Sequence, residues 1–307
     1  MGAEKSLTPV DLVKRSAASP EMIAFLWAAV ENGRSVIVCG DKDTGRTSTL
    51  NAAALFIRPD ARIVSVESRR ELALPHRQWN ALTTRDGDPS KGIPAEEEAA
   101  ALVHLSEALR QRADCILVGD LRRAEAFPVF AAMISGVPTM TTFEADSVKD
   151  LVNRLEDPPF NIPRIVFTAI HLVLIQARED AGGTPRRRTT KVVEVVGYEP
   201  KTNELITNTV FQWEPKSGQF TFKGHSFLYD EIAEKKGIDG EAVQKDMQRR
   251  VDVVNYMVKK GVADSKEIHD LVASYRQDAV GTWRRVVEVD MPPAGARGDF
   301  PPVERIK

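Results

Sequence analysis

The sequence predicts an α/β fold in which a mainly parallel sheet is followed by a small antiparallel meander and C-terminal helices. Short, continuously apolar runs alternate with helix-like segments in the first half, which is typical of parallel strands covered on both faces. A later series of strand-like runs is separated by turn compositions, and the last third has apolar residues at helical spacing. With 307 residues and 42% hydrophobic content, the chain can form one large or two medium domains.

Residues 1–34 are expected to form a linker and a leading helix. The segment 8–13 is interpreted as linker. Ser19 precedes Pro20, and this pair is typical of a helix cap followed by proline at the first helical position. An apolar-rich run then extends to Val30. The sequence therefore predicts that the leading helix begins at residue 20.

Residues 35–180 are expected to form the core. The first apolar run stops at Gly40, and a helix-like segment follows within a few residues, which is how a βαβ unit begins. A polar loop is expected near 87–92, and a proline-rich segment covers 157–163. Buried strands are predicted at 35–39, 61–66, 114–119, 139–143 and 171–176, with helices at 47–56, 94–112 and through 155.

Residues 181–285 are expected to hold the meander and the C-terminal helices. Segment 180–188 contains two glycines and predicts an exposed loop; its three arginines are interpreted as a solvated turn, with a phosphate or partner contact as the second interpretation. Residues 286–307 are rich in proline and glycine and are predicted to be a disordered tail. Meander strands are expected at 191–196, 204–211 and 219–222, and the apolar helical stripe comprises Met247, Val251, Val254 and Val258.

Composition excludes several functional classes. No apolar run approaches the roughly 18 residues of a membrane span, and a cytoplasmic protein is expected. Cys39 and Cys115 lie in strand-like runs and are expected to be buried thiols. The net charge of −2 gives no electrostatic footprint for a nucleic-acid partner. The five histidines are not spaced as metal ligands, so a metal site is not expected. His76 is the one histidine for which a functional role is considered, and a role in packing is equally compatible with the sequence.

The segment from Gly40 to Thr47 has the spacing of the phosphate-binding loop G-x-x-x-x-G-K-[ST], with Arg46 in place of the lysine. In such loops backbone N–H groups surround the phosphates, the lysine contacts their oxygens and the hydroxyl, here of Thr47, holds Mg²⁺. A planar guanidinium does not replace a compact ammonium in that position. The candidate nucleotide-binding residues are Gly40, Lys42, Thr44, Gly45, Arg46, Thr47 and Ser48.

Further segments accompany this loop, at 56–67, 118–126, 145–147 and 161–164. With them the chain resembles the type II/type IV secretion ATPases over about residues 7–275, in particular the archaeal branch that drives type IV pilus and archaellum assembly. The resemblance implies a RecA-like P-loop NTPase fold, usually a hexameric ring, that uses ATP and Mg²⁺ and works against a membrane platform protein. Such a motor is cytoplasmic or peripheral at the inner face of the cell membrane.

The resemblance also assigns site residues. Glu67 matches the acidic-box glutamate that polarises the attacking water, and Asp120 stands where the family has its Walker B glutamate. Glu144 stands where the family has the histidine of its histidine box, and Ser68 replaces an acidic-box aspartate. Glu67, Asp120 and Glu144 are therefore the candidate catalytic residues. Thr47 and Asp120 are the candidate Mg²⁺ ligands.

Four arginines lie in arginine-containing segments of the family. They are expected to stabilise phosphate charge, including across a subunit boundary. These residues are Arg70, Arg85, Arg112 and Arg122.

Four residues differ from the family pattern, each in a different nucleotide-contacting motif: Arg46, Ser68, Asp120 and Glu144. These differences favour a degenerate motor domain that binds nucleotide weakly. Its role would be structural or regulatory, as part of a homo- or hetero-oligomer. In such a site Arg46 and Glu144 are expected to pair with each other. The alternative is an active Mg-dependent ATPase in which Lys42 reaches the phosphates and Glu144 or Asp120 helps hold Mg²⁺. The chain begins in what resembles the linker after the family's N-terminal domain, so a standalone motor domain and a piece of a longer protein both fit.

Overall fold

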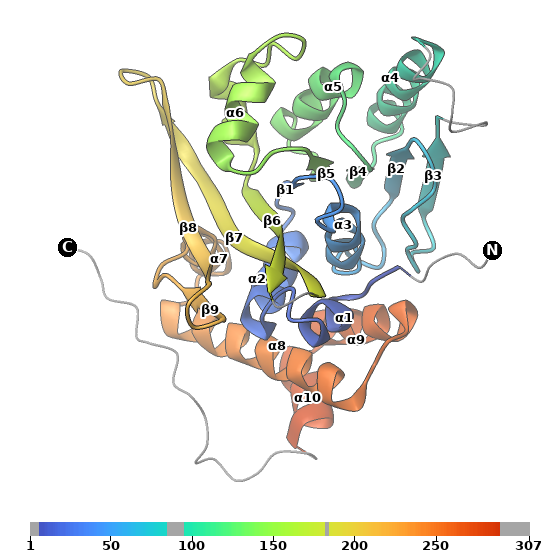
Figure 1. The fold of residues 1–307 in the computed structure, drawn as a ribbon. Helices are drawn as coiled ribbons and strands as arrows, with labels where there is room; N and C mark the ends of the chain where they lie inside the picture. Colours follow the sequence, from blue (N-terminus) through green and yellow to red (C-terminus); the bar gives the residue numbers. More distant parts are fainter. Residues whose placement is uncertain (1–5, 85–94, 182–183, 289–307) are drawn as a thin grey trace.

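The computed structural model describes residues 6–84, 95–181 and 184–288. Its strands form one nine-stranded sheet in the order β3-β2-β4-β5-β1-β6-β7-β8-β9 (Figure 1). Neighbouring strands are parallel from β3 to β6 and antiparallel from β6 to β9. The predicted α/β fold, with a mainly parallel sheet followed by an antiparallel meander and helices, is confirmed.

The strands are β1 (Val36–Gly40), β2 (Ile63–Glu67), β3 (Trp79–Thr83), β4 (Cys115–Val118), β5 (Thr139–Phe143), β6 (Leu172–Ala181), β7 (Thr184–Glu199), β8 (Glu204–Glu214) and β9 (Gln219–Phe222). The helices are α1 (Pro9–Lys14), α2 (Pro20–Glu31), α3 (Arg46–Ala54), α4 (Ala95–Arg110), α5 (Arg123–Ile134), α6 (Val148–Glu156), α7 (Phe227–Lys236), α8 (Gly240–Lys260), α9 (Ser265–Gln277) and α10 (Ala279–Trp283), with short helices η1 (Arg164–Ala169) and η2 (Arg284–Glu288).

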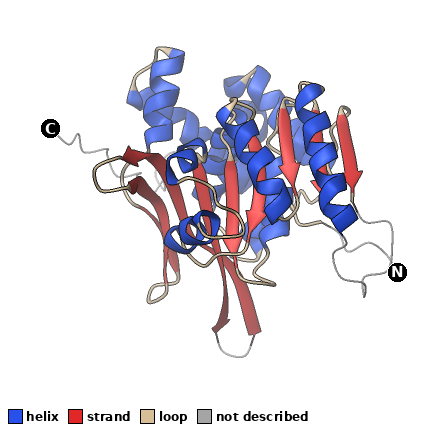
Figure 2. Cartoon of the chain, turned by 90° about the horizontal axis from the view of Figure 1, so that it is seen from above, coloured by secondary structure: helices blue, strands red, loops and turns tan. Residues whose placement is uncertain are grey.

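Helices cover both faces of the parallel part of the sheet (Figures 1 and 2). In β1, Val36 and Val38 join a core with α2, α3 and α8, whereas Ile37 and Cys39 join a core with α4, α5 and α6. Side chains alternate between the two faces of a strand, so a strand buried on both faces is apolar at every position. This explains why the continuous apolar runs predicted these strands. Cys39 and Cys115 are buried free thiols.

The N-terminal segment that the sequence assigned to a linker contains helix α1, so that part of the prediction is wrong. The Thr8 hydroxyl accepts a hydrogen bond from the Asp11 N–H at 3.3 Å, and the Asp11 carboxylate accepts one from the Thr8 N–H at 2.9 Å. This reciprocal capping box starts the helix, with Pro9 at its first position. Helix α2 begins at Pro20 with Ser19 as its cap, as predicted.

The loop predicted at 180–188 is instead part of a long β6–β7 hairpin, paired from Leu172 opposite Glu194 to Ala181 opposite Thr184. Arg188 is buried, and its guanidinium contacts the Glu179 carboxylate at 2.9 Å. A solvated turn is therefore the wrong interpretation for Arg188. The predicted domain boundary at 180/181 falls inside this hairpin.

Two smaller differences concern the edge of the sheet and the C-terminus. Strand β3 was not predicted, because it is short and only half-buried at the sheet edge. Helix η2 continues to Glu288, so the predicted tail cannot begin at residue 286. The rest of that tail and the polar loop predicted at 87–92 lie outside the described residues.

In the described part of the chain no helix combines the length and the apolar character needed to cross a bilayer.

A buried arginine joins three helices below the sheet. Arg250 of α8 is 4% exposed and contacts Glu31 of α2 at 2.5 Å and Asp246, one turn earlier, at 3.0 Å. Its guanidinium also lies 4.7 Å from the ring centroid of Trp27 and 5.1 Å from that of Tyr275. Two carboxylates and two aromatic faces therefore surround one buried cation.

His76 is buried against the C-terminal end of α3. Its Nε2 lies 3.0 Å from the Ile57 carbonyl oxygen, and its ring centroid lies 4.1 Å from that of His269. Of the two roles left open for His76, these contacts support packing. Burial lowers the pKa of His76 to about 4, although the contact with Ile57 opposes this shift.

We expect His76 to make folding stability depend on pH between about 6.5 and 4. The unfolded chain takes up the imidazole proton near pH 6.5 and the folded chain only near pH 4, so stability is lost as the pH falls through this window. His76→Gln keeps a donor for Ile57 and removes the titration. Urea unfolding at pH 7 and pH 4.5 should show that the wild type loses about 2 kcal/mol more than the variant. Equal losses in the two proteins would contradict this assignment.

Candidate functional site

The candidate phosphate loop follows β1 and leads into α3 at the carboxyl end of the parallel strands. A Cβ atom on Gly40 would lie 2.4 Å from the Thr44 hydroxyl and 2.7 Å from the Gln176 carbonyl oxygen, so the loop can close only around a glycine. The Thr44 hydroxyl donates to the Asp41 carbonyl at 2.7 Å. Gly45 has a φ of 96° and occupies the cap position of α3. The loop backbone therefore retains a compact turn that ends at a helix N-terminus.

Arg46 is bound within its own loop. Its Nη1 donates a hydrogen bond to the Gly40 carbonyl oxygen at 2.8 Å, which ties the first residue of α3 to the end of β1. The predicted pair between Arg46 and Glu144 is absent, and that prediction is wrong. Glu144 instead lies 3.8 Å from Arg154, which α6 presents to it. The Arg46 guanidinium, which carries five N–H donors, was expected to find its acceptor in the Glu144 carboxylate. The Gly40 carbonyl in its own loop supplies an acceptor instead.

Glu67 lies at the end of β2 and is 3% exposed. One carboxylate oxygen accepts hydrogen bonds from the N–H groups of Glu71 and Leu72, each at 2.9 Å. Burial raises the pKa of Glu67, and these two N–H donors oppose the rise. The predicted base is therefore engaged in holding the backbone that follows β2.

Asp120 and Arg122 follow β4 and come close to the end of β2. The Asp120 side chain is 48% exposed, and its carboxylate lies 4.0 Å from the Arg122 guanidinium. Reduced hydration raises the pKa of Asp120, while the positive charges of Arg46 and Arg122 oppose the rise. Arg122 also donates to the Ser68 hydroxyl at 2.9 Å. The structure thus brings Glu67, Ser68, Asp120 and Arg122 to one edge of the sheet.

The other predicted loop residues differ in exposure. Lys42 is exposed at the top of the loop, whereas Thr47 and Ser48 are half-buried in the first turn of α3. The predicted Mg²⁺ ligands, Thr47 and Asp120, belong to α3 and to the end of β4. No group of three or more histidine, cysteine or acidic side chains is placed to hold a metal ion, as far as residues 6–84, 95–181 and 184–288 are concerned. The roles of these residues stay predictions.

The structure describes two of the three remaining predicted arginines, Arg70 and Arg112. The Arg70 guanidinium lies 4.8 Å from the ring centroid of Trp79. Arg112 is exposed just after α4 and has a φ of 53°. Arg85 lies outside the described residues.

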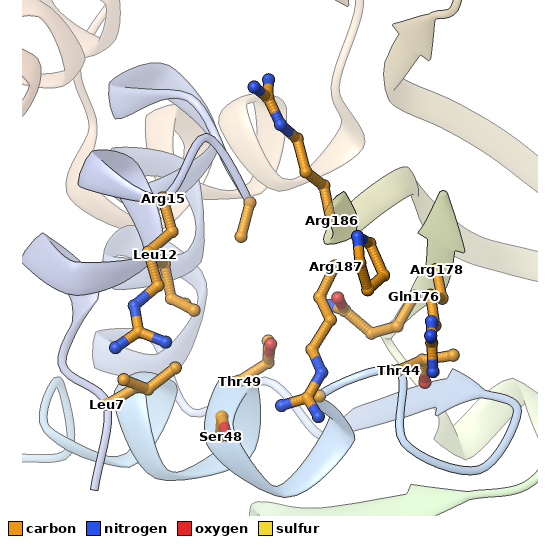
Figure 3. Close-up of a pocket in the computed structure, with 13 residues that line it drawn as sticks. Leu7, Leu12, Arg15, Thr44, Ser48, Thr49, Gln176, Arg178, Arg186 and Arg187 are labelled. Carbon is orange, nitrogen blue, oxygen red and sulfur yellow. The ribbon is translucent and has the colours of Figure 1, made fainter. Parts of the chain in front are cut away.

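A cavity of about 460 Å³ lies beside the phosphate loop and was missed by sequence reasoning (Figure 3). One wall is formed by Gly45 and Ser48, at the start of α3. The sequence signals for it were the phosphate loop and the arginines at 186–187, and most of its other lining residues come from 7–17 and from β6. Its basic residues are Arg15, Arg178, Arg186 and Arg187, and its apolar residues include Leu7, Leu12, Ala17 and Pro185.

The site as a whole fits Mg·ATP only in part. The turn through Gly45 and the start of α3 provide the backbone arrangement that receives phosphate groups in P-loop proteins. The Arg46 guanidinium, however, is hydrogen-bonded to the Gly40 carbonyl. It is therefore not directed toward phosphate oxygens as the flexible ammonium of a lysine would be.

Comparisons with known proteins find relatives of this chain. The family described as "Type II/IV secretion system protein" matches residues 3–178. The uncharacterized protein MJ1287 of Methanocaldococcus jannaschii is 36% identical over 270 residues, which cover 85% of this chain and 98% of that protein. The type IV secretion system protein PtlH of Bordetella pertussis is 31% identical over 179 residues, which cover 55% of this chain and 52% of PtlH.

A solved structure, the VirB11 ATPase of the Brucella suis type IV secretion system in complex with sulphate, is 25% identical, with a TM-score of 0.47. The match covers 65% of this chain and 59% of that one. The chain thus spans nearly the whole of MJ1287 but about half the length of PtlH.

Proposed function

Because the chain belongs to the type II/IV secretion system protein family, we propose that it is a degenerate motor domain of that family. It binds ATP weakly, hydrolyses little or none, and has a structural or regulatory role in the assembly of a type IV pilus, an archaellum or a related secretion machine. The observation that carries this proposal is the hydrogen bond from Arg46 to the Gly40 carbonyl.

This hydrogen bond removes the contact that normally makes the loop selective for a triphosphate. In an active loop a lysine ammonium reaches the β and γ oxygens. Here the guanidinium at that position bridges the two ends of the loop, and a charge-assisted bond of this kind stabilises the loop by about 1.5–3 kcal/mol. ATP would have to displace Arg46 from Gly40 or bind without its contribution.

The other catalytic positions support the same conclusion. Glu67 accepts two backbone N–H bonds, and Glu144 is paired with Arg154. Asp120 is one methylene shorter than the glutamate expected there and lies beside Arg122. A general base must be free to reach the proton that it removes, and the Glu67 carboxylate is bound to its own loop.

As a member of this family the chain is expected to act as a subunit of a ring, homo- or hetero-oligomeric, that contacts a membrane platform protein. It would do so from the cytoplasm or at the inner face of the membrane. An active paralogue in the same ring would supply the hydrolysis that this chain lacks.

Steady-state phosphate release tests the proposal. We compare the wild type with Glu67→Gln, whose amide oxygen can still accept the N–H groups of Glu71 and Leu72, so that the fold is retained. We expect the two proteins to release phosphate at the same background rate with saturating Mg·ATP. Turnover in the wild type that Glu67→Gln abolishes would contradict the proposal and establish an active Mg-dependent ATPase.

A further inference from the structure

The cavity beside the phosphate loop has a basic lining. Its lining includes four arginines and no carboxylate. Within the described ranges, the side chains of Arg15 and Arg187 form neither a hydrogen bond nor an ion pair, whereas the neighbouring Arg188 is paired with Glu179. Concentrated positive charge that is left unpaired is a favourable environment for an anion.

The pairing of the β6–β7 hairpin adds to this concentration. Arg187 lies directly opposite Arg178 in the antiparallel ladder. Like charges at directly opposed positions destabilise a sheet. The two opposed arginines thus add to the positive charge on this side of the loop.

Arg15 and Arg187 face the first turn of α3 from two different elements (Figure 3). Arg15 follows the last residue of α1, and Arg187 extends from β7 over the loop. The Arg187 side chain packs against Gly45, because a Cβ atom on that glycine would lie 3.3 Å from its Cδ. Arg186 projects in the opposite direction, away from α3.

We propose that Arg15 and Arg187 form a clamp that binds the polyphosphate group of a ligand in this cavity and replaces the loop cation that Arg46 does not present. This inference rests on the proposed function, because it concerns the nucleotide site of a degenerate motor domain. Guanidinium groups form paired hydrogen bonds with phosphate oxygens, so two of them can hold a chain of phosphates against the start of α3. The group that this site would recognise is a linear polyphosphate, either free or as part of a nucleotide.

Calorimetric titration with inorganic triphosphate and with ATP tests the assignment. The test protein carries Arg15→Gln and Arg187→Gln, and the matched control carries Arg186→Gln, which removes the same charge from the adjacent residue of β7. We expect the double variant to bind both probes about tenfold or more weakly, and the control to change affinity by about threefold or less. Arg46→Gln should also have an effect of about threefold or less.

Circular dichroism and thermal unfolding check the fold of each variant. Loss of Arg187 removes its repulsion with Arg178, so the melting temperature of the double variant should not fall. Equal affinity for the two probes identifies the polyphosphate as the whole ligand, and tighter binding of ATP identifies a nucleotide; both results support the clamp.

Three results would overturn the inference. They are a double variant that binds like the wild type, a loss in Arg46→Gln or Arg186→Gln as large as in the double variant, and a wild type that does not bind triphosphate. Phosphate release, measured in a separate assay, distinguishes failure of the proposed function from failure of this inference. A wild type that hydrolyses ATP and depends on Arg15 and Arg187 overturns the proposed function alone, whereas an inactive wild type insensitive to both substitutions overturns the clamp alone.

Discussion

Replacing Arg46 with lysine is expected to raise the affinity for Mg·ATP by about tenfold to a hundredfold. The lysine cannot reproduce the planar, multidentate contact with the Gly40 carbonyl, and its ammonium is free to turn toward phosphate oxygens. A charge-assisted hydrogen bond contributes about 1.5–3 kcal/mol, which sets the size of the gain. Titration with a fluorescent ATP analogue in the presence and absence of Mg²⁺ measures it.

The control for this substitution is Arg46→Gln, which releases the Gly40 carbonyl without offering a cation. It should leave ATP affinity within about threefold of the wild type. An Arg46→Lys protein that binds no better than Arg46→Gln would show that the loop is not the cause of weak binding.

Removing the buried cation of α8 is expected to cost about 3–5 kcal/mol of folding stability. Arg250→Met fills similar space but leaves Glu31 and Asp246 without their shared partner, at side-chain exposures of 15% and 22%. It also removes the cation that lies over the Trp27 and Tyr275 rings. Urea unfolding at pH 7 measures the loss.

Lys245→Met in the same helix is the matched control. Lys245 forms an ion pair with Glu241 at 2.6 Å, but both side chains are more than half exposed, and such pairs contribute about 0–1 kcal/mol. A loss in Arg250→Met no larger than in Lys245→Met would contradict the structural role given to this cation.

The inner strands of the parallel sheet could be predicted because burial on both faces leaves a largely apolar run, which the half-buried edge strand β3 lacks. The start of α2 could be predicted because Ser19 and Pro20 are a local signal. Helix α1 has a comparable signal for a helix start, because Thr8 and Asp11 have the three-residue spacing of a capping box. The prediction of a linker over 8–13 overlooked this signal.

The parts that could not be predicted depend on contacts between distant segments. The buried Arg188 depends on partners from distant segments, which include Glu179 across the hairpin and the Ser16 carbonyl, whereas the pair of glycines before it gave the stronger signal for a loop. The partner of Arg46 was predicted incorrectly for a related reason. Charge complementarity favoured Glu144, but Arg154 of α6 contacts that carboxylate, and a carbonyl of its own loop lies within reach of Arg46.

The most direct test of the degenerate site is the affinity of the unmodified chain for ATP, measured by calorimetry with and without Mg²⁺. With Arg46 hydrogen-bonded to Gly40, we expect a dissociation constant weaker than roughly 100 µM that Mg²⁺ changes little. A dissociation constant in the low micromolar range that requires Mg²⁺ would contradict it, because the loop would then present a working phosphate contact despite Arg46.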